Sequence, residues 1–262
     1  MKIKLLFTLF ATFLVVVLLA SSESTYAKEK DTTPQHSKLE KTKHKNILYD
    51  KELDAYFDTR ENGYIDDVVY EVSGGKIVRE IPVEEYLEIE EVDVEEIKTT
   101  TSVPESTGTD TITPNAVYES YIYEEESNVL TRIYGDRVSI VQENPGPGDD
   151  TFTLAYSASY SSEFNISVNS AITTAIAAGV SYTFNRSAGI SSEHSMTIQE
   201  GYYGYWRFDP KVRKSQGTLA KLRDGFRVSE QFLRTYYPVK KNGDLDGYLV
   251  PVKGKLPAPI NI

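Results

Sequence analysis

Few residues in this chain could catalyse a reaction, because its 262 residues include three histidines and no cysteine. Nucleophilic catalysis by serine or threonine needs a base within hydrogen-bonding distance, and histidine is the usual base. His36 and His44 lie in a stretch that we expect to be flexible, and such a segment cannot hold a catalytic geometry. His194 precedes Ser195, but neighbouring side chains on a strand point to opposite faces. We therefore predict no catalytic residue and no enzyme.

Metal and cofactor chemistry finds little support in the residue pattern. There is no thiol and no His-Glu-x-x-His motif for zinc. Eight carboxylates between Glu84 and Glu96 alternate with valine and isoleucine, as on a solvated face, rather than converging through a glycine turn. Residues 242–247 resemble part of a calcium loop but lack the closing acid, which favours a tight turn. We expect neither metal nor cofactor, while a hydrolase based on two carboxylates stays a distant alternative.

Aromatic and basic side chains near the C-terminal half offer a candidate ligand-binding surface. Aromatic residues cluster at positions 202–206 and 236–237, and six cations against Asp224 form a basic patch between Pro210 and Val228. Exposed rings can stack on sugars, although rings that cap the core are the alternative interpretation. The predicted ligand-binding residues are Tyr203, Tyr205, Trp206, Arg213 and Lys214. An anionic cell-wall polymer, a glycan or an acidic protein would complement them.

The first 27 residues have the layout of a secretory signal peptide. Lys2 and Lys4 precede an apolar run from Leu5 to Ala20, and small residues precede a cleavage point after Ala27. Without this segment the formal charge changes from −11 to −12, which disfavours nucleic acid as a partner. We predict a secreted protein, extracellular or associated with the cell envelope. The absence of cysteine fits a Gram-positive exoprotein.

Composition then divides the remainder into four parts. Residues 28–45 are lysine-rich and nearly free of apolar side chains, which predicts a flexible basic arm. Residues 46–98 form a small acidic region with a hairpin turning at Ser73-Gly74-Gly75 and a short helix after Pro82. Residues 99–114 resemble a linker. Residues 115–262 form the main β-rich domain, in which Gly135-Asp136 and residues 143–150 are predicted turns.

A long alternating segment dominates that domain. Apolar side chains occupy even positions from Phe152 to Val168 and again from Val180 to Ile198, with hydroxyl side chains between them. Side chains on a strand alternate between faces, so each arm has one apolar and one hydroxyl-rich face. The apolar spacing becomes helical between Asn169 and Gly179, which predicts a short helix. The fold class is mainly β, with a β-sandwich-like domain of long strands and one short helix.

Two functions are compatible with this segment. In the first, the arms are sandwich strands of a secreted, non-enzymatic binding or surface-interaction protein. In the second, residues 151–198 resemble the amphipathic insertion hairpin of aerolysin-type pore-forming toxins, since a membrane-crossing strand needs ~9–11 alternating residues. That resemblance implies a protein that is secreted soluble, oligomerises and enters a membrane. Arg186 and His194 would then face lipid, which opposes this interpretation.

Overall fold

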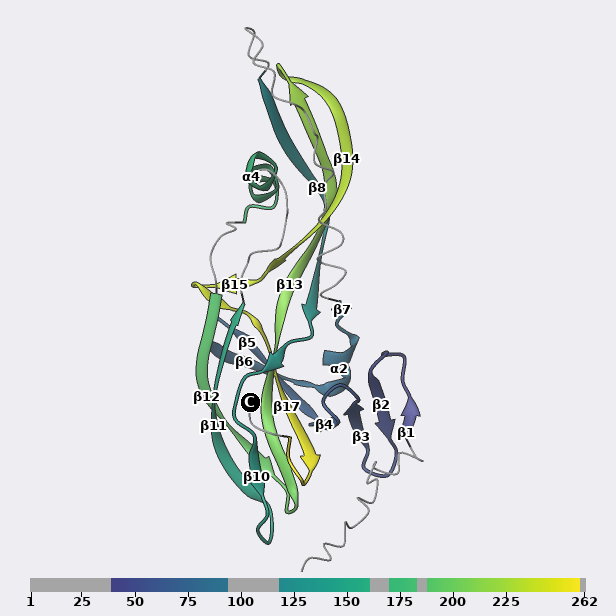
Figure 1. Ribbon diagram of the computed structural model, residues 1–262, viewed down its shortest axis with the longest axis vertical. Coiled ribbons are helices and arrows are strands. Elements are labelled where there is room, and N and C mark those ends of the chain that lie inside the picture. Colours follow the sequence, from purple (N-terminus) through teal and green to yellow (C-terminus); the bar gives the residue numbers. More distant parts are fainter. Residues whose placement is uncertain (1–38, 94–117, 161–169, 183–187, 260–262) are drawn as a thin grey trace, which may run out of the picture. The chain divides into compact units, whose positions relative to one another are not determined.

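The structure is a computed structural model that describes residues 39–93, 118–160, 170–182 and 188–259. The predicted signal peptide, the predicted linker and Arg186 lie outside the described residues. The described residues from Glu40 to Pro259 belong to one compact unit. The fold is mainly β, as predicted (Figure 1).

Thirteen strands form one sheet, and two pairs of strands form small sheets beside it. The large sheet contains β1 (Leu39–Lys41), β2 (Ile47–Asp50), β3 (Ala55–Asp58), β4 (Gly63–Ile65), β5 (Val68–Ser73), β6 (Lys76–Pro82), β7 (Glu91–Val92), β8 (Glu119–Ile133), β9 (Asp136–Arg137), β10 (Gln142–Asn144), β13 (Tyr202–Arg223), β14 (Phe226–Pro238) and β17 (Gly247–Lys255). The small sheets are β11 (Asp150–Tyr160) with β12 (Ala188–Ile198), and β15 (Lys240–Lys241) with β16 (Asp244–Leu245).

Strand β13 is the centre of the large sheet. It pairs antiparallel with β17 and β10 in its first half and with β8 and β14 in its second half. Its first half is covered on both faces: Tyr203 and Tyr205 belong to one core, and Trp206 and Phe208 belong to the core beneath β11 and β12. Packing of the β11–β12 pair over the large sheet gives the predicted β-sandwich-like arrangement.

The N-terminal hairpin and helix form as the sequence predicts, but they do not make a separate core. Strands β5 and β6 turn at Gly74 and Gly75, which both have positive φ, and helix α2 (Val83–Glu88) follows Pro82. Strand β17 pairs with both β4 and β5, so the acidic region shares its sheet and core with the C-terminal strand. The boundary predicted between the acidic region and the main domain is therefore crossed by strand pairing and by a shared core in the described residues.

Two local predictions also need correction. Residues 39–41 of the predicted flexible arm form strand β1. The expected hairpin across Gly135-Asp136 does not form, because β8 and β9 each pair with β13 instead. At Gly135 the two backbones approach so closely that a Cβ atom would lie 1.7 Å from the carbonyl oxygen of Phe208. The turn at Asn242-Gly243 between β15 and β16 is tight, as predicted.

A cluster of buried charges connects the N-terminal strands to β13. Arg207 is fully buried, and its Nη1 and Nε lie 2.9 Å from Asp58 and Asp209, respectively. Arg132 of β8 contacts the same Asp209 carboxylate at 3.1 Å, and the Tyr86 hydroxyl of α2 donates to it as well. Burial alone would raise the pKa of Asp209, but the two guanidinium groups outweigh it and hold that pKa below its ordinary value.

We predict that Arg207→Met destabilises the protein by about 3–5 kcal/mol, because Asp58 and Asp209 would stay buried without their partner. The free energy of unfolding in urea measures this loss. Arg227→Met is the matched control, since Arg227 pairs with Glu124 and Glu230 on the exposed surface and its removal should leave the urea midpoint unchanged. Equal midpoints for the two variants would contradict a structural role for the buried cluster.

Candidate functional site

The β11–β12 pair is an amphipathic hairpin, and its apolar face is buried. The two strands pair over 11 positions from Asp150↔Ile198 to Tyr160↔Ala188. The fully buried side chains of this face are Leu154, Tyr156, Ile190, Met196 and Ile198. They pack on Trp206 and Phe208 of β13, Leu249 of β17 and Leu245 of β16. Each such side chain contributes about 1.5–3 kcal/mol when it is removed from water.

The opposite face of the hairpin is exposed and rich in hydroxyl groups. Its exposed serines and threonines are Thr151, Thr153, Ser157, Ser159, Ser191, Ser195 and Thr197. Hydroxyl groups meet across the strands at 3.0 Å in the pairs Thr151–Thr197 and Thr153–Ser195. Residues 151–159 pair with residues 189–197, and within these two segments Glu193 is the one charged side chain on this face. The predicted alternation of the two faces is confirmed in the described strands.

The hairpin is attached to the large sheet mainly through side chains. The hairpin forms a two-stranded sheet of its own. In the described part of the chain, its backbone pairs with the preceding segment through the isolated bridge Ser139↔Tyr156. The Ser157 N–H donates to the Val138 carbonyl at 3.0 Å, and the Asn144 side chain donates to the Ile198 carbonyl at 2.8 Å. A continuous ladder, such as the one between β13 and β17, does not hold it.

A helix lies in the segment that joins the two strands. Helix α4 (Ser170–Gly179) is the predicted helix of residues 169–179, and it lies against β8 rather than beside the hairpin's apolar face (Figure 1). Ile172, Ala175 and Ile176 pack on a cluster that includes Tyr123. Gly179 ends the helix where a Cβ atom would lie 2.5 Å from the Tyr123 carbonyl oxygen. Val180 and Tyr182, which were predicted to begin the second arm, instead follow the helix and pack on its cluster. Residues 161–168 and 183–187 of the two arms lie outside the described residues.

His194 interrupts the apolar face of β12. Its ring lies 4.5 Å from the ring of Tyr70 and 5.6 Å from that of Trp206, measured between centroids. Burial lowers the pKa of His194, and the carboxylate of Glu80 opposes this shift. Because this pKa lies below the ordinary value of 6.5, the half-buried imidazole is mainly neutral at pH 7, where it contacts Tyr70 and Trp206.

The three aromatic residues predicted to bind a ligand are not available to one. Tyr203, Tyr205 and Trp206 are 3%, 1% and 1% exposed. Their expected surface position is wrong because other strands cover both faces of β13. Tyr203 and Tyr205 point into the core on one face, and Trp206 points into the core on the other face. The alternative interpretation, in which these rings complete the core, agrees with the structure.

The basic residues of the predicted patch are distributed rather than concentrated. Arg213 is exposed and donates to Asn128 at 3.1 Å, whereas Lys214 forms an ion pair with Glu90 at 2.7 Å. Lys211 is buried against Glu71, and Lys221 and Arg223 both pair with Glu119. Carboxylates from other strands thus neutralise most of the patch. A ligand at Arg213 and Lys214 stays a prediction, separate from the buried rings.

No protein-family model, no curated protein and no solved structure matches this chain. Within the described residues, neither helix has the length and apolar character needed to span a bilayer. The functional argument therefore depends on the geometry of the β11–β12 hairpin.

We predict that the packing of the hairpin weakens in acid through His194. Because the pKa of His194 is lowered in the folded state, the unfolded chain binds the proton more readily, so stability falls as pH drops below the ordinary value of 6.5. The urea midpoint, followed by the fluorescence of Trp206, should fall more between pH 7.5 and 5 in the wild type than in His194→Gln.

His44→Gln is the comparison for this pH dependence, because burial also lowers the pKa of His44. By the same linkage it should remove its own part of the pH-dependent change in the urea midpoint and leave the part due to His194 in place. An identical pH response in the wild type and His194→Gln would show that His194 does not couple the hairpin to pH.

Proposed function

We propose that this protein is exported and acts on membranes by inserting the β11–β12 hairpin, as a pore-forming protein. The observation that carries the proposal is a hairpin of two 11-residue strands with one hydroxyl-rich face and one face that is apolar except for Ser192 and His194. This length matches the ~9–11 residues of a strand that crosses the hydrocarbon core. Apolar side chains facing lipid and hydroxyl groups facing water would satisfy both environments.

The way in which the soluble fold covers the apolar face of the hairpin supports this proposal. The contacts that keep this face away from water could be released. Side chains of the hairpin contact β13, β16 and β17, and these contacts are non-directional. A bilayer offers the same side chains an equivalent apolar environment, so transfer need not cost their burial energy. Backbone hydrogen bonds within the hairpin would be retained, since β11 and β12 bond to each other.

The other role considered from the sequence, binding through surface aromatics, has less support because the three rings are buried. The membrane role needs no catalytic residue and no cofactor. His194 on the lipid-facing side is compatible with it when the imidazole is neutral, since the cost of mid-bilayer burial is large for charged groups.

A disulfide that fastens the hairpin should abolish activity. Ser139 and Tyr156 are directly opposite in the bridge that joins the hairpin to the preceding segment, and the chain has no other cysteine to compete. We predict that Ser139→Cys/Tyr156→Cys releases dye from loaded phosphatidylcholine–cholesterol vesicles when reduced and does not when oxidised. Comparing one variant in two redox states cancels the cost of losing the Tyr156 ring.

The matched control joins the two strands to each other instead. Thr153 and Ser195 are paired, with hydroxyl oxygens 3.0 Å apart, so Thr153→Cys/Ser195→Cys links β11 to β12 without fastening them to the large sheet. It should release dye in both redox states. Release by the oxidised Ser139–Tyr156 variant, or no release by the wild type, would contradict insertion of this hairpin.

The hydroxyl face predicts the lining of the pore. We expect Ser195→Lys, a change at an exposed position, to leave folding unaltered and to shift the selectivity of single channels in planar bilayers toward anions. Ser229→Lys, at an exposed position of β14 outside the hairpin, should leave the reversal potential unchanged. Equal reversal potentials for Ser195→Lys and the wild type would place the hydroxyl face away from the conduction path.

A further inference from the structure

The strands β11 and β12 are connected to the large sheet at one place. Strand β10 ends at Asn144, β13 begins at Tyr202, and these two residues are paired. Residues 145–149 connect β10 to β11, and residues 199–201 connect β12 to β13 (Figure 1). We call these two segments the legs of the hairpin. A movement of the hairpin away from the sheet requires the backbone of the legs to change.

One buried side chain holds both ends of the hairpin. Asn144 is 2% exposed, and its side-chain amide donates to the carbonyl oxygens of Gly148 at 2.9 Å and Ile198 at 2.8 Å. Gly148 lies in the first leg, and Ile198 is the last residue of β12 before the second leg. The side-chain oxygen of Asn144 accepts from the Gly146 N–H at 3.2 Å. Both N–H donors of the amide are therefore used to hold the two sides of the hairpin base.

Further hydrogen bonds join the two legs to the same residue and to each other. The Gly201 N–H donates to the backbone carbonyl of Asn144 at 2.8 Å, and the Gly148 N–H donates to the carboxylate of Glu200 at 3.0 Å. Because Asn144 belongs to β10 and β10 pairs with β13, these bonds fix the base of the hairpin on the large sheet.

Each leg contains a glycine with room to change its conformation. Gly148 and Gly201 have φ angles of 87° and 75°, and a Cβ atom added to either would meet no atom within 4 Å. Glycine adopts positive and negative φ with similar ease, so these positions could turn once their hydrogen bonds are released. Hydrogen bonding rather than side-chain packing therefore holds the two glycines.

We propose that Asn144 is a positioning residue that sets how readily the β11–β12 hairpin leaves the large sheet, because its amide must release both sides of the base before the legs can turn. A buried amide whose acceptors move away is left unsatisfied, so Asn144 favours the closed position. The purpose of the release rests on the proposed membrane role, whereas the release itself is measurable without a membrane.

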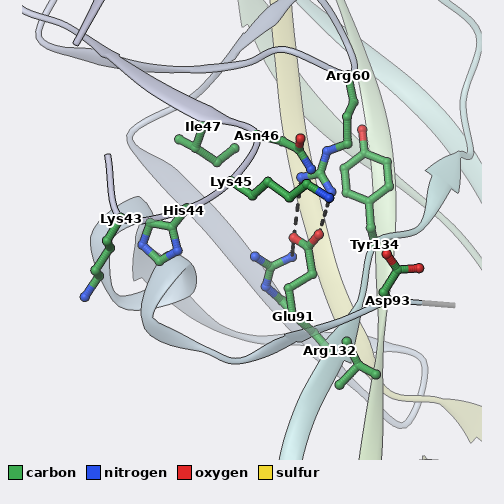
Figure 2. A pocket seen from close by; sticks show the side chains of 11 residues that line it. Lys43, His44, Lys45, Asn46, Ile47, Arg60, Glu91, Asp93, Arg132 and Tyr134 are labelled. Atoms are coloured by element: carbon green, nitrogen blue, oxygen red, sulfur yellow. Dashed lines mark hydrogen bonds and ion pairs between the residues drawn. The ribbon is translucent and has the colours of Figure 1, made fainter. Parts of the chain in front are cut away.

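The large sheet has attachments of its own that this release would leave in place. Figure 2 shows the carboxylate of Glu91 between the guanidinium groups of Arg60 and Arg132. None of these residues belongs to the hairpin or to its legs. A substitution at Arg60 can therefore weaken the large sheet without touching the base of the hairpin.

Thiol labelling of the folded protein measures the release. The chain has no cysteine, so Met196→Cys places a single thiol on the buried face of the hairpin, and Val250→Cys places one in the core that includes α2. We expect Asn144→Ala to raise the labelling rate of the thiol at position 196 about tenfold, since two buried hydrogen bonds of the closed position are lost. An unchanged rate at position 196 would overturn the proposal.

Arg60→Met is the matched control for a general loss of stability. It removes the ion pairs with Asp58 and Glu91. It should speed labelling at position 250, which requires the large sheet to open, and leave labelling at position 196 at the wild-type rate. If Arg60→Met speeds labelling at position 196 as much as Asn144→Ala does, release follows global stability and the role assigned to Asn144 is wrong.

Glu200→Ala supplies a second, milder change at an exposed position. It removes the hydrogen bond between the legs and should raise labelling at position 196 about threefold. Should Asn144→Ala not fold, a wild-type labelling rate in Glu200→Ala would count against the hydrogen-bonded base as the control of release. Dye release from phosphatidylcholine–cholesterol vesicles is scored separately: absence of release by the wild type would contradict the membrane role, while the labelling rates alone decide the role of Asn144.

Discussion

The ion pair between Arg207 and Asp209 is the interaction on which the arrangement of the described strands depends. Both residues are fully buried on β13, and their remaining hydrogen-bonding capacity is satisfied by Asp58, Arg132 and Tyr86. A desolvated charge is tolerated only with well-placed partners, so β3, α2 and β8 are held in one geometry around β13. The same geometry leaves the Nε–H of Arg132 buried without an acceptor.

The hairpin is attached by a different kind of interaction. Charges and backbone ladders are directional, and they connect β13 with β8, β14 and β17 along most of its length. The β11–β12 pair depends instead on apolar side chains and the bridge between Ser139 and Tyr156. Apolar contacts can be exchanged for any apolar environment, whereas a ladder must be broken before it is replaced. Under the proposed membrane role, this difference would let the hairpin leave the large sheet without breaking a continuous ladder.

Features with a local period were predictable from the sequence, and features set by distant partners were not. Even-numbered apolar positions gave both faces of the hairpin, and the change to helical spacing gave α4. No local signal indicated that β8 and β9 would each pair with β13, or that cover on both faces would bury Tyr205 and Trp206. The spacing of Arg207 and Asp209, two charges on one face within an aromatic strand, was the readable sign of a buried cluster.

Successive side chains of β13 point to opposite faces of the sheet. The ion cluster therefore lies on one face, and the apolar contacts to the hairpin lie on the other. Arg207 and Asp209 point toward α2 and β3, while Trp206 and Phe208 lie beneath the hairpin. Departure of the hairpin would uncover the two aromatic rings and leave the charges covered by their own partners. The large sheet could therefore keep its ion cluster while the hairpin changes its environment. If β13 carried the buried charges and the hairpin contacts on the same face, departure of the hairpin would also expose the charges.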